Sequence, residues 1–278
     1  MNLNASHMAG GQITYEWLTG NTYIIKVELY RDCNGIAAPA QLTGLNISSS
    51  SCSQSFVVNL DYTGYYFEVT PTCVNYTSTC NGGTSYGIEV HLYQDTVVLP
   101  QACTDWHFEY DLCCRNANVT NLVNPSTEDL YLDAYLNNLN TPFNNSGQPN
   151  EHNAPMLYSS NFYELDWSVT DLDGDSLVYE MTYPKGSAGV NLNLQPGFSL
   201  NDPFMSANFN LDNTTGMAQF YLSPSQMIID VNCKISEYRN INGNYELVGY
   251  SSRNLQYSIV SGPYNYAPVL SGINKTND

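Results

Sequence analysis

The chain has 278 residues, of which 26 are acidic and only 8 are basic, so its formal net charge is −18. A charge of this sign repels phosphate backbones and anionic lipids, which argues against nucleic acid and membrane surfaces as partners, although it is compatible with divalent cations. The length predicts two domains, and no apolar run is long enough to span a membrane.

Strands are predicted along the first half of the chain, because apolar and polar side chains alternate there. In Thr22–Asp32, the side chains of Tyr23, Ile25 and Val27 fall on one face. The stretches QSFVVNLDY, YYFEVTP, YGIEVHLYQDTVVLP and DWHFEYDLCC follow with Gly, Asn, Ser and Pro between them. This period of two, punctuated by turn residues, is typical of β-strands.

Residues 126–140, STEDLYLDAYLNNLN, begin with Ser126, which could cap a helix. The leucines at 130, 132 and 136 nevertheless fall at a period of two, so the segment is predicted to be a strand. Residues 140–155 are rich in Asn, Pro and Gly and are interpreted as a linker or a long loop.

After this segment the alternation restarts and continues for about a hundred residues, as in an Ig-like sandwich. The sequence therefore predicts an all-β fold with two β-sandwich-like domains stapled by disulfides. The boundaries expected are residues 1–150 for an N-terminal cysteine-rich domain, 151–268 for an Ig/cadherin-like domain, and 269–278 for a C-terminal linker.

The chain contains an even number of cysteines, which are Cys33, Cys52, Cys73, Cys80, Cys103, Cys113, Cys114 and Cys233. There is no CxxC pair, and the four histidines form no HxxxH or HExxH pattern, which argues against zinc. Low charge and abundant Asn and Thr favour an oxidising compartment, so disulfides are preferred over a metal site or redox chemistry.

Connectivity does not follow from the sequence, because eight cysteines allow many pairings. Local pairing is the simplest hypothesis. It joins Cys33 to Cys52, Cys73 to Cys80, and Cys103 to Cys113 or Cys114, and it leaves the other member of that adjacent pair for Cys233. The last bridge would lock the two halves into a rigid unit. The alternative is that Cys233 is free and buried in a sandwich core.

The loop DLDGDSL brings several carboxylates together, and these repel one another unless a cation or solvent screens them. Hard oxygen ligands in a short loop suit Ca²⁺. The candidate ligands are Asp171, Asp173 and Asp175, with Asp166 as a further one. The alternative is a polar turn that enters a strand, with Gly174 supplying a positive φ. Calcium is the only cofactor predicted.

Several motifs resemble a known family. They include SHMAGGQITYEW, YIIKVELYRDCNG, CTDWHFEYDLCCRN, DLDGDSLVYEM and SRNLQYSIV, in this order. Together they resemble the N-terminal region of large secreted proteins of Bacteroidota, which commonly carry PKD-type repeats and a gliding-motility-associated or type IX secretion sorting domain. The CTDWxFxYxLCCRN block is the specific part of the resemblance. The repeats and the sorting domain are absent here, so the chain is expected to be part of a longer protein.

The resemblance implies export and an extracellular or cell-surface location, without a known catalytic activity. Enzyme motifs such as GxSxG or a Walker loop are absent from the sequence, and no enzyme is predicted. Two tripeptides resemble the Bacteroidota O-glycosylation pattern of Asp, Ser or Thr, and an aliphatic residue, with Thr96 and Ser176 as acceptors.

The function predicted is therefore a non-catalytic extracellular module for adhesion, gliding motility or assembly of an extracellular structure. Its expected partners are other surface or secretion-system proteins, or copies of itself. The alternative is a calcium-assisted glycan-binding module, which the abundance of Tyr, Trp and Asn favours.

Overall fold

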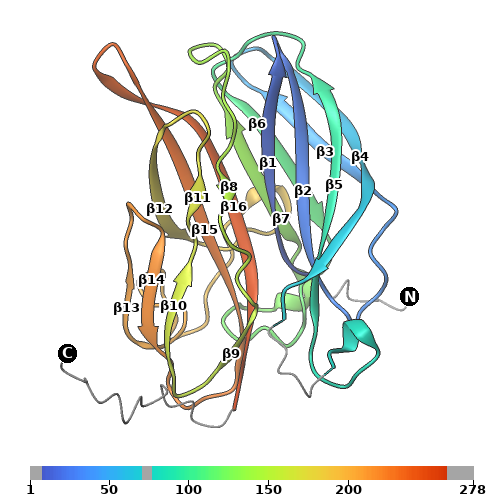
Figure 1. The fold of residues 1–278 in the computed structure, drawn as a ribbon, viewed down its shortest axis with the longest axis vertical. Helices are drawn as coiled ribbons and strands as arrows, with labels where there is room; N and C mark the ends of the chain where they lie inside the picture. The colour runs from blue at the N-terminus through green and yellow to red at the C-terminus, as the bar shows by residue number, and fades with distance from the viewer. Residues whose placement is uncertain (1–7, 71–76, 262–278) are drawn as a thin grey trace, which may run out of the picture.

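A computed structural model describes residues 8–70 and 77–261, and it confirms the all-β prediction (Figure 1). The strands are β1 (Met8–Thr19), β2 (Thr22–Asp32), β3 (Gln41–Ser49), β4 (Gln54–Glu68), β5 (Ile88–Val98), β6 (Trp106–Leu112), β7 (Leu130–Leu136), β8 (Gln148–Pro149), β9 (Met156–Tyr158), β10 (Phe162–Asp166), β11 (Val169–Thr170), β12 (Ser176–Thr182), β13 (Ala207–Leu211), β14 (Met217–Tyr221), β15 (Met227–Ile241) and β16 (Asn244–Val260). The described residues also form three short 3-10 helices, η1 (Thr79–Asn81), η2 (Pro125–Thr127) and η3 (Ser187–Gly189). Within the described residues, no helix is long and apolar enough to cross a membrane.

One eleven-stranded sheet joins strands from both halves of the chain. Its order is β1-β2-β5-β4-β3-β6-β7-β16-β15-β12, and β9 pairs with β16. Strand β16 pairs with β15 along one edge, and along its other edge it pairs in turn with β7, β1 and β9. Because β16 touches both β7 and β1, it closes the strands of the first half into a ring. The long C-terminal hairpin is therefore part of both halves of the fold.

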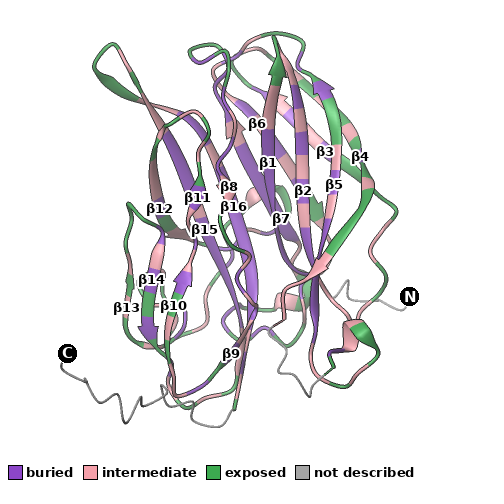
Figure 2. Cartoon of the chain, viewed as in Figure 1, coloured by how far each residue is buried: buried purple, intermediate pink, exposed green. Residues whose placement is uncertain are grey.

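The buried side chains form two main clusters, which Figure 2 shows as purple positions along the strands of each half. The first cluster lies among β1 to β7 and contains large rings such as Trp106 and Phe108. The second lies between β15, β16 and the small sheet β10-β14-β13, and it also takes in Tyr30 and Val90 from the first half. A boundary at residue 150 thus stays a prediction, because the second cluster draws on residues from both sides of it.

Local alternation accounts for the strands that were predicted. In β2, Tyr23, Ile25, Val27 and Leu29 are buried, and the residues between them are more exposed. The segment that begins like a capped helix is indeed a strand, β7, whose leucines are buried in the first cluster. A period of two places these leucines on one face of a sheet, and a helix would have scattered them.

The segment 140–155 is a loop apart from β8, but it is not an exposed linker. The side chains of Thr141, Asn144 and Ser146 are buried. Ser146 Oγ accepts the backbone N–H of Tyr15 at 2.7 Å, and Ser146 in turn donates its own N–H to the Tyr15 carbonyl at 3.0 Å. These polar groups are satisfied by β1, so the loop is fixed on the fold. The predicted linker 269–278 lies outside the described residues.

The disulfides differ from the local pairing that was predicted. They join Cys33 to Cys80, Cys52 to Cys103, and Cys113 to Cys114. Strand register explains the second bridge: β3 and β6 are antiparallel with Ser49 opposite Trp106, so Cys52 and Cys103 lie three residues beyond that pair and meet. Sequence proximity thus does not decide the first two bridges, whose partners are 47 and 51 residues apart. Cys73 lies outside the described residues.

The predicted bridge from Cys113 or Cys114 to Cys233 is wrong. Cys233 is free and buried on β15, between Met181 of β12 and Arg253 of β16. It is a small apolar residue of the second cluster, as the alternative interpretation held. The two halves are joined by hydrogen-bonded strands rather than by this disulfide.

The specific motif CCRNANVTN has a structural place in the fold. Arg115 and Asn121 follow β6 and are both buried against β15. The Arg115 guanidinium bonds to the Asp230 carboxylate, and Asn121 Nδ2 donates to the Asp230 carbonyl at 2.7 Å. Asn121 Oδ1 also accepts the Asp230 N–H at 2.8 Å. The motif therefore anchors the segment after β6 on the shared hairpin.

Candidate functional site

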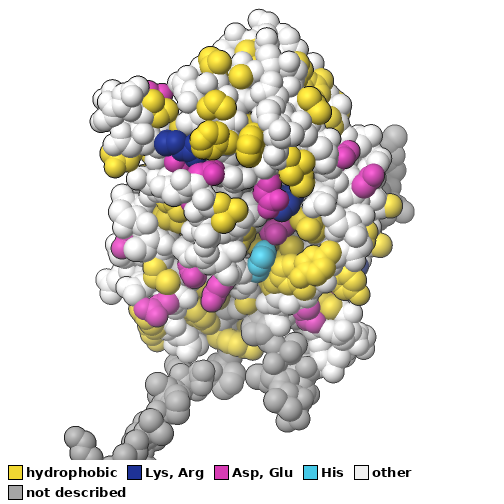
Figure 3. All heavy atoms as spheres, turned by 45° about the horizontal axis from the view of Figure 1, so that its top comes forward, with side chains coloured by type: hydrophobic (Ala, Val, Ile, Leu, Met, Phe, Trp, Pro, Cys, Tyr) yellow, Lys and Arg dark blue, Asp and Glu magenta, His cyan; other side chains and the backbone are white. Residues whose placement is uncertain are grey.

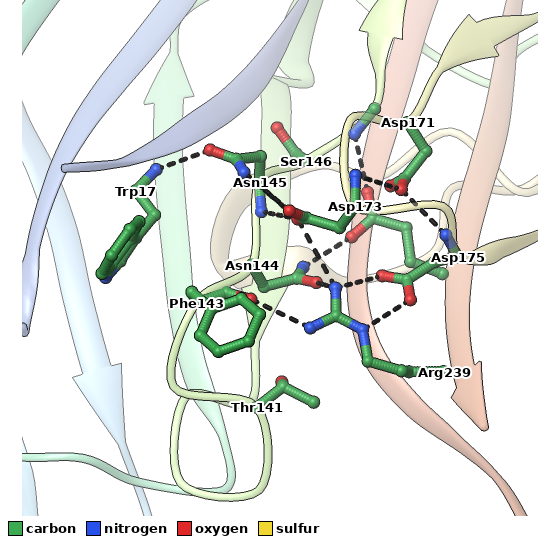
Figure 4. A network of polar contacts seen from close by, with 12 residues as sticks. Trp17, Thr141, Phe143, Asn144, Asn145, Ser146, Asp171, Asp173, Asp175 and Arg239 are labelled. Carbon is green, nitrogen blue, oxygen red and sulfur yellow. Dashed lines mark hydrogen bonds and ion pairs between the residues drawn. The ribbon is translucent and has the colours of Figure 1, made fainter. Parts of the chain in front are cut away.

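Four loops from distant parts of the sequence meet at one end of the molecule, the upper end in Figure 1. They are the β1–β2 turn, residues 137–147, residues 171–175, and the β15–β16 turn, and we call them together the loop face. Asn145 links three parts of it: its Oδ1 accepts the Trp17 N–H at 2.8 Å, and its own N–H donates to Asp173 Oδ2 at 2.6 Å (Figure 4). Loops held on a rigid β-scaffold are a common setting for binding sites.

Arg239, near the end of β15, occupies the centre of the loop face (Figure 4). Its Nε and Nη2 donate to the two carboxylate oxygens of Asp175 at 2.6 and 2.7 Å. Nη2 also donates to Asn144 Oδ1 at 2.6 Å, and Nη1 donates to the Phe143 carbonyl at 2.9 Å. Asp173 Oδ2 lies 3.5 Å from Nη2. The guanidinium thereby ties the aspartate loop to the loop 137–147, in the bidentate geometry that favours Arg–carboxylate pairs.

Behind Arg239 lies a fully buried carboxyl group, that of Glu237. Its Oε1 accepts the Gly147 N–H at 2.8 Å, and its Oε2 accepts Asn144 Nδ2 at 2.9 Å. Burial raises the pKa of Glu237 to about 8; the two hydrogen bonds lower it in part, and the charge of Asp171 raises it further. Glu237 is therefore mostly protonated at neutral pH.

The candidate calcium ligands are only partly brought together. Asp171, Asp175 and Glu237 offer carboxyl oxygens that all lie within 4.8 Å of one another, and these are the residues that could hold a divalent cation. Such a cation would have to displace the proton that Glu237 carries at neutral pH. Asp173 lies outside this group, bonded to Asn145 and facing Arg239.

Asp166, proposed as a further ligand, also lies outside this group. It sits on β10, where its Oδ1 accepts the Ser168 N–H at 2.8 Å. Glu237 was missed because it stands more than sixty residues along the chain from the aspartates, and no local motif marks it.

The aspartate loop also has the features of a polar turn. Asp171 Oδ1 accepts the backbone N–H groups of Asp173 and Asp175, both at 2.9 Å, and Gly174 adopts a φ of 77°. The other oxygen of Asp171, Oδ2, is buried and has no hydrogen-bond partner. Burial raises the pKa of Asp171, and the charges of Asp175 and Asp173 add to this effect. Arg239 supplies the positive charge that Asp173 and Asp175 need.

A hollow of about 390 Å³ opens beside Arg239 on the loop face. It is lined by Asn140, Thr141, Pro142, Phe143, Asp173, Arg239, Asn240, Ile241 and Asn242. The Phe143 ring is 55% exposed, with the Arg239 guanidinium carbon 5.8 Å and the Trp17 ring 6.0 Å from its centre. Figure 3 brings this end forward and shows basic and acidic side chains beside hydrophobic ones. The hollow thus combines an accessible ring with amide and charged groups.

More apolar side chains are exposed on the same loops. They are Leu18, Leu139, Leu172 and Tyr245, with exposed fractions between 45% and 68%. Asn140, the residue after Leu139, donates to Glu246, the residue after Tyr245, at 3.0 Å, so the loop 137–147 is bonded to the β15–β16 hairpin. Gathered apolar groups with polar neighbours are the composition of an interaction surface.

Thr96 and Ser176, the predicted glycosylation sites, both have exposed side chains. Thr96 lies on β5 and Ser176 begins β12, directly after Asp175. Two other groups of possible metal ligands in the described chain contain Cys33 with Cys80 and Cys113 with Cys114. Their sulfurs are engaged in disulfides and are not thiolates.

Comparison with known proteins adds no relative to this picture. No family model matches the chain, and no curated protein matches it. The resemblance to secreted Bacteroidota proteins therefore rests on the sequence motifs.

Proposed function

We propose that the chain is a non-catalytic module of a secreted or cell-surface protein, and that the loop face is its contact surface. The observation that carries the proposal is the loop face itself. A largely buried polar network around Arg239 and Glu237 ties the loop 137–147 to β15 and to the aspartate loop, and Asn145 ties the same loop to β1. Exposed apolar and amide groups stand above this network. This design, in which rigid support lies under an adaptable surface, limits the entropy lost on binding.

Two further features support an extracellular location. Three disulfides occur among the described residues, and disulfides persist in oxidising environments outside the cytosol. The motifs that resemble secreted Bacteroidota proteins suggest the same location. The expected work is adhesion, gliding motility or assembly, with another surface protein, a secretion-system protein or a second copy of the chain as partner.

Site-specific photo-crosslinking on the native cell surface tests this proposal. A photoreactive residue replaces Tyr245 on the loop face, and in a matched control it replaces Phe162 on β10; the two side chains are 64% and 58% exposed. We expect a discrete cross-linked species from position 245 and none from position 162. Equal cross-linking at both positions, or none at either, would argue against the loop face as the contact surface.

A calcium-assisted glycan-binding module is the second candidate. Phe143 and the amides of the hollow favour it, because sugar rings combine an apolar face with hydroxyl groups. The carboxylates of Asp171, Asp175 and Glu237 lie next to this hollow and are the groups that could take the ion. A glycan array probed with and without Ca²⁺ separates the two candidates. Binding that disappears on chelation supports the glycan module, and an empty array leaves the surface module alone.

A further inference from the structure

We infer that the hollow beside Arg239 is a sugar site that selects uncharged sugars over acidic ones. This inference rests on the proposed binding function and names the class of ligand that the loop face takes. An arginine in a polar hollow ordinarily suggests a site for a carboxylate or a sulfate. Two features of this hollow point the other way.

The first feature is that Arg239 has almost no donors left. A guanidinium carries five N–H groups, one on Nε and two on each Nη. Nε donates to Asp175, and both N–H groups of Nη2 are engaged by Asp175 and Asn144. Nη1 donates one of its two N–H groups to the Phe143 carbonyl. One N–H remains, so Arg239 cannot form the bidentate pair of hydrogen bonds by which a guanidinium binds a carboxylate.

The second feature is the charge around the guanidinium. Asp173 lines the hollow, and Asp175 is bonded to Arg239 directly below it. Asp171 precedes both in the same loop, and Glu246 accepts a hydrogen bond from Asn140, which lines the hollow. Among the described residues, Arg239 is the one basic residue that lines the hollow. An acidic sugar would meet a surplus of negative charge at short range, which costs free energy near a protein surface.

An uncharged sugar fits the groups that are present. Asp173 Oδ1, which accepts one hydrogen bond from Asn145 Nδ2, has a lone pair left for a hydroxyl proton, and the exposed amide of Asn242 can both donate and accept. The exposed ring of Phe143 offers an apolar surface to the C–H face of a sugar. At about 390 Å³ the hollow falls in the lower part of the size range of small-molecule sites. It therefore suits one or two sugar units.

The test compares matched hexose and hexuronate oligosaccharides on an array and then by calorimetry, with the full 278-residue chain. We expect binding of the hexose members and none of the hexuronates. Phe143→Ala should weaken that binding by about tenfold, the cost of one lost ring contact. Phe162→Ala, which removes a ring of similar exposure from β10, should leave it unchanged.

A second variant checks the reason for the selectivity. Asp173→Asn keeps the shape of the side chain but removes one charge, so it should narrow the difference between hexoses and hexuronates, with melting temperature as the folding control. Preferred binding of the hexuronates by the unmodified chain overturns the inference. Absence of sugar binding, together with protein cross-links from position 245, also overturns it and leaves the surface module in place. If the chain neither binds a sugar nor forms protein cross-links from position 245, both the sugar site and the proposed contact surface are contradicted.

Discussion

The guanidinium of Arg115 and the carboxylate of Asp230 form an ion pair in which neither side chain has exposed surface. The two residues are 115 positions apart, and each has further partners: Arg115 Nη1 donates to Asn254 Oδ1 at 3.0 Å, and Asn254 Nδ2 donates to Asp230 Oδ1 at 2.7 Å. Arg115 Nε donates to the Asp129 carbonyl at 3.0 Å, and Nη2 donates to the Lys185 carbonyl at 2.8 Å. Each of the two buried charges therefore has hydrogen-bond partners in addition to the opposite charge.

Arg115→Met should lower the free energy of unfolding by roughly 3–5 kcal/mol, because it leaves the Asp230 carboxylate buried without its partner. Urea denaturation measures the loss. Lys26→Met is the matched control: it breaks an ion pair with Glu16 whose side chains are 20% and 31% exposed, and it should cost about 1 kcal/mol or less. Equal midpoints for the two variants would show that the buried pair does not anchor the fold.

The disulfides should contribute unequally to stability. Replacing Cys52 and Cys103 by alanine opens a bridge with a sequence separation of 51 and should cost roughly 4 kcal/mol in loop entropy. Replacing Cys113 and Cys114 should cost far less, because a bridge between adjacent residues closes almost no loop. Denaturation of the two double variants under non-reducing conditions compares them. A larger loss from the adjacent pair would contradict this account.

The carboxyl group of Glu237 should make the protein less stable as the pH rises. Its pKa is about 8 in the folded state against an ordinary value of 4.5, so between these values the folded state keeps a proton that the unfolded state has lost. The contribution of Glu237 to the free energy of unfolding is complete below pH 4.5. It falls by about 1.4 kcal/mol per pH unit between pH 4.5 and pH 8, and it changes no further above pH 8.

Urea denaturation of the unmodified chain and of Glu237→Gln at pH 6 and pH 8 isolates this effect. The amide stays neutral, so the variant should gain stability relative to the unmodified chain as the pH rises. Glu180→Gln, at an exposed position on β12, should track the unmodified chain. Parallel pH profiles for Glu237→Gln and the unmodified chain would rule out Glu237 as the titrating group.

Calcium at millimolar concentration should raise the melting temperature, because an ion that binds only the folded state stabilises it. Asp171→Asn should abolish the gain, since Asp171 belongs to the group of three carboxylates within 4.8 Å. Asp166→Asn should retain it, because Asp166 is bonded to Ser168 outside that group. A melting temperature that ignores calcium would leave the aspartate loop as a polar turn alone.

The sequence by itself determined the strands, because alternation is a local property. The buried faces of β2 and β7 follow from the alternation of their own residues. The turn at Gly174 is likewise indicated by its immediate neighbours in the sequence DLDGDSL. The same alternation also indicated an all-β fold. These features depend on near neighbours in the chain, which are visible without knowing how distant segments pair.

Only the tertiary structure decided which distant residues meet. The register of β3 against β6 joins Cys52 to Cys103. The register of β12 against β15 places Ser176 opposite Tyr238. The next residue beyond each of these is Asp175 on one side and Arg239 on the other, so the two come together. Strand pairing is set by how the hydrophobic faces pack together, and a shift of one residue would have turned these side chains to the opposite face. The candidate site therefore depends on the register between β12 and β15, which cannot be predicted from a local sequence motif.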